Sequence, residues 1–272
     1  MIWTWLWWQC PTWVVGLLLV MLMTGIFWLA QRLCVSPPED PEKDTSVVSA
    51  VIGLFALLLA FTFGMGLERY NIRRDLVLQE ANALGTSYLR ARLLKDADRK
   101  TLTHSLFCYG QVRLSFFEAR EDAHLLSRAY EQTDVWQSRI WNQLSVVSQK
   151  APPSDAILSR LLDSLNELFD LALSRQIALE SRIPPLVLEV LTWVSLLSAF
   201  MMGYYQKHSS SNQKMRVFLM FLVMGLVMML ILDLDRPRSG WITVSQAPLN
   251  FTLEDIQKSG QLSNVCQADA SK

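Results

Sequence analysis

The sequence lacks the short motifs that carry most enzyme chemistry. It contains no HExxH or paired CxxC pattern, no P-loop, no GxGxxG and no GxSxG. Each of these motifs supplies metal ligands, phosphate-binding amides or an activated nucleophile, so their absence removes the simplest evidence for such chemistry. Serine and threonine are plentiful, but none stands at motif spacing from a base. We predict no catalytic residue, no metal site and no cofactor, and expect that the chain is not an enzyme.

Histidine and cysteine are also scarce, with three and four residues. His104 and Cys108 stand four residues apart and can share a helix face, but a zinc site needs more ligands than these two. None of the cysteines is part of a CxxC pair; they are Cys10, Cys34, Cys108 and Cys266. We expect reduced thiols that behave as small apolar side chains, given the cytoplasmic placement argued below.

Neither charge sign is in excess. The chain has 25 Lys and Arg against 25 Asp and Glu, and residues 67–183 alone hold sixteen basic and fifteen acidic residues. Nucleic-acid binding needs a basic surface, so this balance argues against a nucleic-acid partner. It is typical of a helical bundle with many salt bridges.

Charge is almost absent from four long apolar runs. These are Thr12–Gln31, Ser46–Gly66, Pro184–Tyr205 and Val217–Leu232, and their one charged residue is Glu189. Because a hydrocarbon core of about 30 Å is crossed by about 20 helical residues, each run predicts a transmembrane helix. The predicted fold class is an all-α integral membrane protein with four transmembrane helices and a cytoplasmic helical insert between the second and third.

The runs divide the chain into four predicted parts. Residues 1–67 hold the first two spans and a Trp-rich anchor, 68–183 the helical insert, 184–234 the last two spans, and 235–272 a C-terminal segment. An ionisable residue within a span is a functional candidate. Glu189, however, lies about a turn from Pro185, where it could equally face water or pair with an arginine.

Orientation follows from the basic residues beside the spans. An even number of spans places both termini and the insert on one side, together with Arg69, Arg73, Arg74, Arg175, Arg182, Arg236 and Arg238. The other side has Arg32, Lys43, Lys207, Lys214, Arg216 and the acidic loop SPPEDPEKD. The positive-inside rule therefore predicts that the termini and the insert are cytoplasmic.

The insert is predicted to be helical throughout. Residues 67–95 have no proline and one glycine, so the second span should continue as one rod, about 40 Å beyond the membrane. A second helical stretch is expected over 99–150, and a third over 156–182 after the helix-breaking APPSD. The run WITVSQAPL should be extended along a neighbouring surface, and the polar tail after Leu253 should be loose.

The second span offers a candidate pore face. Leu57 and Phe61 lie one turn apart, and in a symmetric oligomer such side chains could form a hydrophobic constriction that gates by dewetting. Another apolar face carries Phe55, Leu59 and Phe63, so the register stays open. These residues could also simply face lipid or other helices.

Three arginines, Arg69, Arg73 and Arg74, follow this span directly. As a ring in an oligomer they would attract anions. They could also merely reflect the positive-inside rule.

The fourth span ends in the charged sequence DLDRPRSGW. Buried charges need partners, so we expect boundary ion pairs here. Asp233 or Asp235 should pair with the arginines that follow the second span. Arg236 and Arg238 could pair with acidic residues of the insert such as Glu68 or Glu80.

Three further blocks stand out: RYNIRRDLVLQEANALGTSYLRARLL (residues 69–94), SLNELFDLALSRQIALESRIPP (164–185) and ILDLDRPRSGWITVSQAPL (231–249). Together they resemble the bacterial family labelled DUF4239, or bestrophin-like domain. The resemblance covers about residues 45–251. Its name suggests a distant relation to bestrophins, which are pentameric anion channels with four membrane helices, cytoplasmic termini and a pore lined by the second helix.

The resemblance implies a channel in the bacterial inner membrane, permeable to anions such as chloride, formed by a homo-oligomer with a pentamer favoured and surrounded by lipids. The chain departs from bestrophins where their acidic calcium clasp would lie, since only Asp233 and Asp235 stand there. The alternative is a non-conducting membrane scaffold or sensor whose insert recruits a partner.

Overall fold

A computed structural model of the chain describes residues 10–33, 41–119, 122–150, 154–206, 210–260 and residue 266. The chain divides into two compact units. Unit 1 comprises Met1–Tyr70 and Arg182–Ile242, and unit 2 comprises Asn71–Ser181 and Thr243–Lys272. Each unit is built from helices, and no strand occurs among the described residues.

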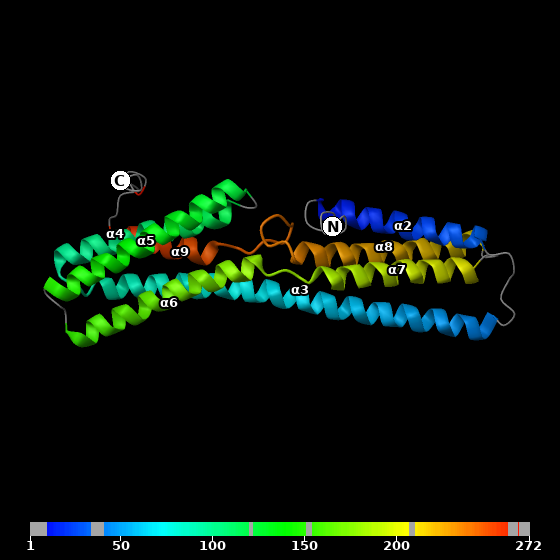
Figure 1. The fold of residues 1–272 in the computed structure, drawn as a ribbon, viewed down its shortest axis with the longest axis horizontal. Coiled ribbons are helices and arrows are strands. Elements are labelled where there is room, and N and C mark those ends of the chain that lie inside the picture. Colours follow the sequence, from blue (N-terminus) through cyan, green and yellow to red (C-terminus); the bar gives the residue numbers. More distant parts are fainter. Residues whose placement is uncertain are drawn as a thin grey trace. The chain divides into compact units, whose positions relative to one another are not determined.

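Four helices of the described chain are long and apolar enough to cross a membrane. They include α2 (Thr12–Leu33), α3 (Pro41–Ala91), α7 (Pro185–Tyr205) and α8 (Ser211–Leu234), labelled in Figure 1. The predicted all-α fold with four spans is confirmed. The apolar run of α3 ends at Gly66, but the helix continues unbroken for 25 further residues, which confirms the predicted rod.

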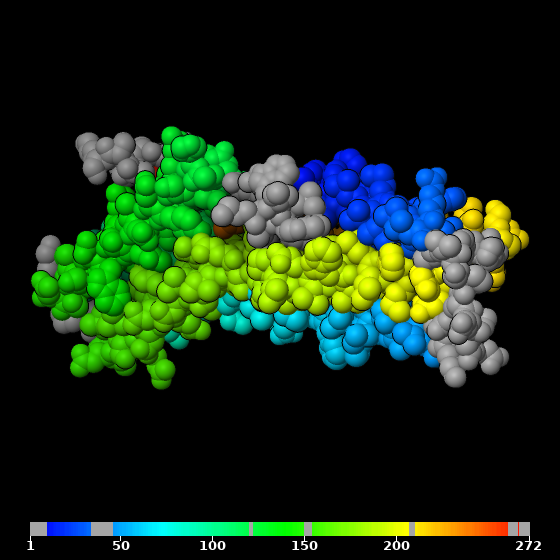
Figure 2. Space-filling view, turned by 45° about the vertical axis from the view of Figure 1, so that its right-hand side comes forward, coloured from blue at the N-terminus to red at the C-terminus, as the bar shows by residue number. Residues whose placement is uncertain are grey.

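Unit 1 is a bundle in which α2 packs against α7 and α8. In the space-filling view, the blue surface of α2 lies directly against the yellow end of this bundle (Figure 2). Glycines allow the closest approaches: a Cβ on Gly203 would lie 2.4 Å from the carbonyl oxygen of Phe27. A Cβ on Gly225 would lie 2.4 Å from Cγ2 of Val20. Small residues at such crossings are typical of helices that pack within membranes.

Unit 2 combines the remainder of α3 with α4 (Asp96–Glu118), α5 (Ala123–Lys150), α6 (Asp155–Glu180) and α9 (Ala247–Gly260). Their apolar faces enclose one core, to which each helix contributes fully buried side chains; examples are Leu84, Leu106, Ile140, Leu165 and Leu249. Helix α9 packs against α4, where a Cβ on Gly110 would lie 2.6 Å from Cδ2 of Leu253.

Two local predictions in unit 2 are wrong. The stretch over 99–150 is two helices, because the carboxylate of Asp122 accepts hydrogen bonds from the amides of His124 (2.9 Å) and Leu125 (3.1 Å) and so begins α5. The tail after Leu253 is helical as far as Gly260, since Leu249, Leu253 and Ile256 recur at helical spacing and are buried.

The expectation of reduced thiols is also wrong for two cysteines. Cys108 of α4 and Cys266 form a disulfide within unit 2, across a sequence separation of 158 residues. His104 Nε2 lies 3.6 Å from Cys108 Sγ, so the two residues do share a helix face. The sulfur is bonded to Cys266 and is not free to bind a metal. Cys10 is a free thiol, and Cys34 lies outside the described residues.

Candidate functional site

The membrane part of α3 has two apolar faces with opposite environments. Phe55 and Leu59 are 1% and 7% exposed and belong to the core of unit 1. Leu57 and Phe61 are 52% and 64% exposed in the single chain. The face that carries Phe55 and Leu59 is therefore used for packing within the chain, whereas the face that carries Leu57 and Phe61 is not.

Small residues accompany this exposed face. A Cβ added to Gly53 or Gly64 would meet nothing within 4 Å. Ala56 and Ala60 are exposed as well, at the same three- and four-residue spacing. Unlike Gly203 and Gly225, these small residues make no close contact within the chain. They leave room for a neighbouring helix or for solvent.

The three predicted arginines have different environments. Arg73 is buried and donates from Nε to the carbonyl of Ala178 (3.0 Å) and from Nη2 to that of Ser181 (2.7 Å). These carbonyls end α6, where a cation is favourable to the helix dipole. Arg74 is exposed and pairs with the adjacent Asp75 at 3.2 Å, whereas Arg69 is half-buried. The anchoring role of Arg73 on α6 is not visible in the sequence.

At the end of the fourth span, Asp233 organises the backbone. Its Oδ1 accepts from the amide of Trp241 (2.9 Å) and the hydroxyl of Thr12 (3.4 Å), and its Oδ2 accepts from the amide of Ile242 (2.8 Å). Gly240 lies so close that a Cβ there would be 2.8 Å from the carbonyl oxygen of Asp233. The carboxylate therefore closes the turn that follows α8, where an arginine partner was predicted from the sequence.

Asp235 connects two chain segments of unit 1. It is fully buried, and its Oδ1 accepts from the amide of Ile183 (2.9 Å), just before α7. Arg236 beside it is also buried, and Arg238 is half-buried. Both carboxylate oxygens of Glu80 are engaged within unit 2.

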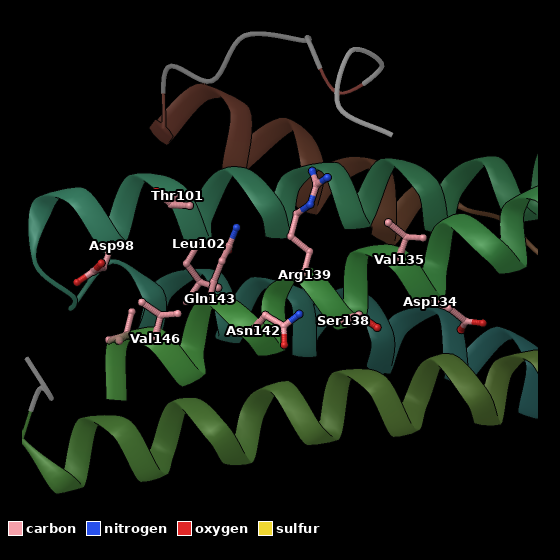
Figure 3. Close-up of a pocket in the computed structure, with 11 residues that line it drawn as sticks. Asp98, Thr101, Leu102, Asp134, Val135, Ser138, Arg139, Asn142, Gln143 and Val146 are labelled. Atoms are coloured by element: carbon pink, nitrogen blue, oxygen red, sulfur yellow. The ribbon is translucent and has the colours of Figure 1, made fainter. Parts of the chain in front are cut away.

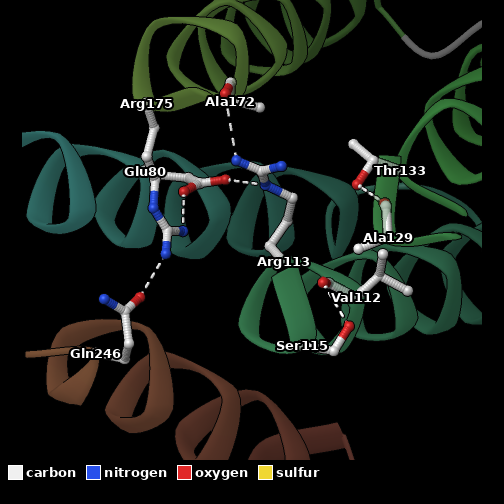
Figure 4. Close-up of polar contacts among 9 residues, drawn as sticks. All are labelled: Glu80, Val112, Arg113, Ser115, Ala129, Thr133, Ala172, Arg175 and Gln246. Carbon is white, nitrogen blue, oxygen red and sulfur yellow. Dashed lines mark hydrogen bonds and ion pairs between the residues drawn. The ribbon is translucent and has the colours of Figure 1, made fainter. Parts of the chain in front are cut away.

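That engagement forms a buried ionic cluster in unit 2 that we did not predict. Glu80 accepts from Arg113 Nε and from Arg175 Nη1, each at 2.5 Å (Figure 4). Arg113 Nη2 also donates to the carbonyl of Ala172 (3.2 Å), and Arg175 Nη2 donates to the side-chain carbonyl of Gln246. Four chain segments thus meet around one carboxylate: α3, α4, α6 and the run just before α9.

The electrostatics favour the charged forms of Glu80 and Arg113, whereas burial and the neighbouring Arg113 lower the pKa of Arg175 from its ordinary value. Burial alone would raise the pKa of Glu80, but Arg113 and Arg175 outweigh it and hold that pKa below its ordinary value. Burial alone would lower the pKa of Arg113, yet Glu80 raises it overall. Glu80 and Arg113 therefore stay ionised at neutral pH. Removing one partner would leave a buried charge exposed to a low dielectric.

Unit 2 also has a surface groove of about 670 Å³ between α4 and α5 (Figure 3). Its walls combine apolar side chains such as Val135 and Val146 with the carboxylates of Asp98 and Asp134. Neither histidine nor cysteine lines it. The groove offers a binding surface of mixed apolar and acidic character.

Comparison with known proteins places these features in a family. The sequence profile of the Bestrophin-like domain matches residues 17–249. No curated protein matches the chain. Among solved structures, the chain resembles a single-substitution variant of a bacterial bestrophin homologue from Klebsiella pneumoniae, with a TM-score of 0.74 at 12% identity over 94% of this chain and 100% of that one.

The bestrophin homologue from Klebsiella pneumoniae solved by zinc phasing gives a TM-score of 0.70 at 14% identity, over 92% of this chain and 99% of that one. Identities this low compare the folds alone. The family assignment rests on the profile match, which covers most of the chain and includes all four spans from Leu17 onward. The resemblance seen in the sequence is confirmed, and the chain belongs to the Bestrophin-like family.

Proposed function

We propose that the chain assembles as a homo-oligomer, with a pentamer favoured, and that the assembly is an anion-permeable channel of the bacterial inner membrane. The observation that carries the proposal is the exposed face of α3. Phe61 and Leu57 project from a membrane helix whose opposite face is fixed in the subunit core. Membership of a family named for bestrophins supports an axial position for this helix.

In this proposal, Leu57 and Phe61 form the constriction. Rings of bulky apolar side chains exclude water when the pore is narrow, and this dewetting blocks ions until the ring widens. Of the three predicted arginines, Arg69 and Arg74 supply the positive charge that favours anions such as chloride where the helix leaves the membrane. Arg73 is buried against the carbonyls that end α6, so its replacement would affect folding rather than a ring of charge at the pore.

The polar part of α3 extends the proposed path. Beyond the apolar run, its exposed positions include Asp75, Gln79, Asn82 and Thr86, which again recur every three or four residues. Mostly uncharged polar side chains suit an aqueous conduit. The distribution of arginines favours placing unit 2 and both termini in the cytoplasm, whereas the Cys108–Cys266 disulfide of unit 2 argues against a reducing compartment.

Chloride flux from proteoliposomes tests the proposal. The double variant Leu57→Ala with Phe61→Ala should release chloride faster than wild type, because the constriction becomes wider and wets. The matched control is Leu197→Ala with Phe200→Ala on α7, where both side chains are exposed and no constriction is proposed. This control should leave flux unchanged. Arg74→Glu, which has an exposed side chain, should then lower the preference for chloride over potassium.

Equal flux from the Leu57/Phe61 variant and the α7 control, both folded and assembled like wild type, would contradict the channel proposal. It would favour the second candidate function, a non-conducting scaffold or sensor. The groove between α4 and α5 is the observation that supports this candidate, since its mixed lining suits a protein segment. Replacing Val135 and Val146 with Asp should then abolish capture of a partner without changing folded yield.

A further inference from the structure

A second groove lies in unit 1 and is almost wholly apolar. It has a volume of about 710 Å³ and runs between α2 and α8. Its walls are large side chains from both helices: Trp13, Leu17, Val20, Met21, Leu222, Leu226 and Met229. The groove exists because Gly16 and Gly225 let the two backbones approach, so that the flanking side chains rise on either side of a shallow floor.

Apart from the indole N–H of Trp13, near the start of α2, the groove is lined by apolar side chains and one hydroxyl. Its one hydroxyl, on Thr24, donates to the carbonyl of Val20 at 2.7 Å and is thereby satisfied within α2. An occupant must therefore be apolar over this stretch. In a membrane-spanning bundle the available apolar chain is a lipid acyl chain.

The character changes at the end where α2 stops and α8 begins. A second cavity of about 300 Å³ lies there, and Thr24 and Phe218 line both cavities, so the two are neighbours along one crevice. Lys214 lines this second cavity, and its Nζ lies 5.2 Å from the ring centre of Trp28. No carboxylate of the described residues forms a salt bridge with Lys214, so a counter-charge can come from a ligand.

The crevice is longer than one leaflet. It follows α2 from Trp13 to Trp28, about 22 Å at 1.5 Å per residue. Half of the hydrocarbon core is about 15 Å, so the crevice has room for an acyl chain with its headgroup at the Trp28 and Lys214 end and continues past the midplane. Tryptophan and lysine are the side chains expected at the headgroup level.

We infer that the crevice between α2 and α8 is a binding site for an anionic phospholipid, with an acyl chain along the apolar groove and the phosphate beside Lys214. The site is independent of ion conduction. It requires only that unit 1 spans a membrane. It also gives Lys214 a role. By the positive-inside rule this lysine lies on the non-cytoplasmic side, where basic residues are less common.

Native mass spectrometry of the full chain in detergent tests the site, with phosphatidylglycerol and phosphatidylcholine as probes. Leu222→Trp fills the groove and should abolish retained lipid, whereas Val223→Trp, on an exposed face outside the groove, should not. Leu17→Trp fills the groove from the other helix and guards against a folding defect in the first variant.

A second pair of variants, one test and one control, examines the end of the crevice where the headgroup is placed. Lys214→Gln should lower the affinity for phosphatidylglycerol about fivefold relative to phosphatidylcholine, since one basic residue near a charged lipid contributes about that much. Arg216→Gln removes the same charge one half-turn away, outside both cavities, and should change little.

Three results would overturn the inference. The first is wild-type lipid retention by both groove-filling variants. The second is an equal loss of affinity in Lys214→Gln and Arg216→Gln. The third is a changed oligomer size in Leu222→Trp and Leu17→Trp with lipid retention intact, which would make the crevice an interface between copies of the chain.

Discussion

The two units of this chain solve the packing problem by different means. In unit 1 the surface is as apolar as the core, with Trp193, Leu197 and Leu219 all more than half exposed. Burial from water cannot then distinguish inside from outside, so close-fitting glycines such as Gly203 specify the contacts. In unit 2 an ordinary apolar core forms, and it also encloses the ionic cluster around Glu80. Shape specifies the first unit, and a buried charge cluster helps to specify the second.

The largest expected effect is in unit 2. Glu80→Ala leaves two guanidinium groups buried without their anion, which should destabilise the fold by about 3–5 kcal/mol. Hydrogen exchange of α4 and α6 should rise sharply, while exchange in α2, α7 and α8 changes little. Glu167→Ala, at an exposed site on α6, is the matched control. Wild-type exchange in Glu80→Ala would show that the cluster does not stabilise unit 2.

Reduction of the Cys108–Cys266 disulfide should have the second-largest effect on stability. Opening a long loop increases the entropy of the unfolded chain, and such a bridge typically contributes about 2–4 kcal/mol. A dithiol should therefore lower the thermal midpoint of the wild type. Cys266→Ser should start from the lower midpoint and not respond to the dithiol. An identical response in both proteins would mean that the bridge is absent from the purified protein.

A smaller effect is expected in unit 1. Gly203→Ala places a Cβ against the backbone of Phe27, and overpacking of this kind costs about 1–3 kcal/mol. The fraction of monodisperse protein recovered from the membrane should fall. Gly25→Ala is the control on α2 itself, because its Cβ meets nothing within 4 Å. Equal recovery of the two variants would contradict the claim that close packing at Gly203 determines how α2 contacts α7.

Mild acidification should give the smallest effect and should be confined to unit 2. The folded pKa of Glu80 is below its ordinary value of 4.5, so its contribution is fully present above that pH. It is lost as the pH falls below 4.5 and through the folded value. Hydrogen exchange of α4 should thus be constant from about pH 7 to 5, after correction for intrinsic rates, and rise at lower pH. A loss of protection already at about pH 6 would contradict the assignment.

Much of the fold was predictable because its signals are local. Four uncharged runs and the proline-free rod after Gly66 identify the spans and α3 directly. The break before α5 was missed because it depends on the single cap Asp122, in a region with good helical composition. Helix α9 was missed although Leu249, Leu253 and Ile256 have helical spacing, because the polar residues between them dominate the tail.

The sites were less predictable, since they depend on contacts between distant segments. The partners of Asp233 are mainly backbone amides, which a pattern of side chains in the sequence cannot predict. The ionic cluster did leave a trace: Glu80 stands between Val77 and Leu84 on a buried stripe, and Arg113 stands between Tyr109 and Phe116. A charge on an apolar helical face indicates a buried pair, but not which residues form it.

A density map of the detergent-solubilised assembly, viewed along the membrane normal, tests the central claim most directly. The expected result is several copies of the chain around one axis, five in the favoured case, with α3 innermost and the side chains of Leu57 and Phe61 directed at the axis. A single copy, or an assembly in which Leu57 and Phe61 face the detergent belt, would contradict the channel account.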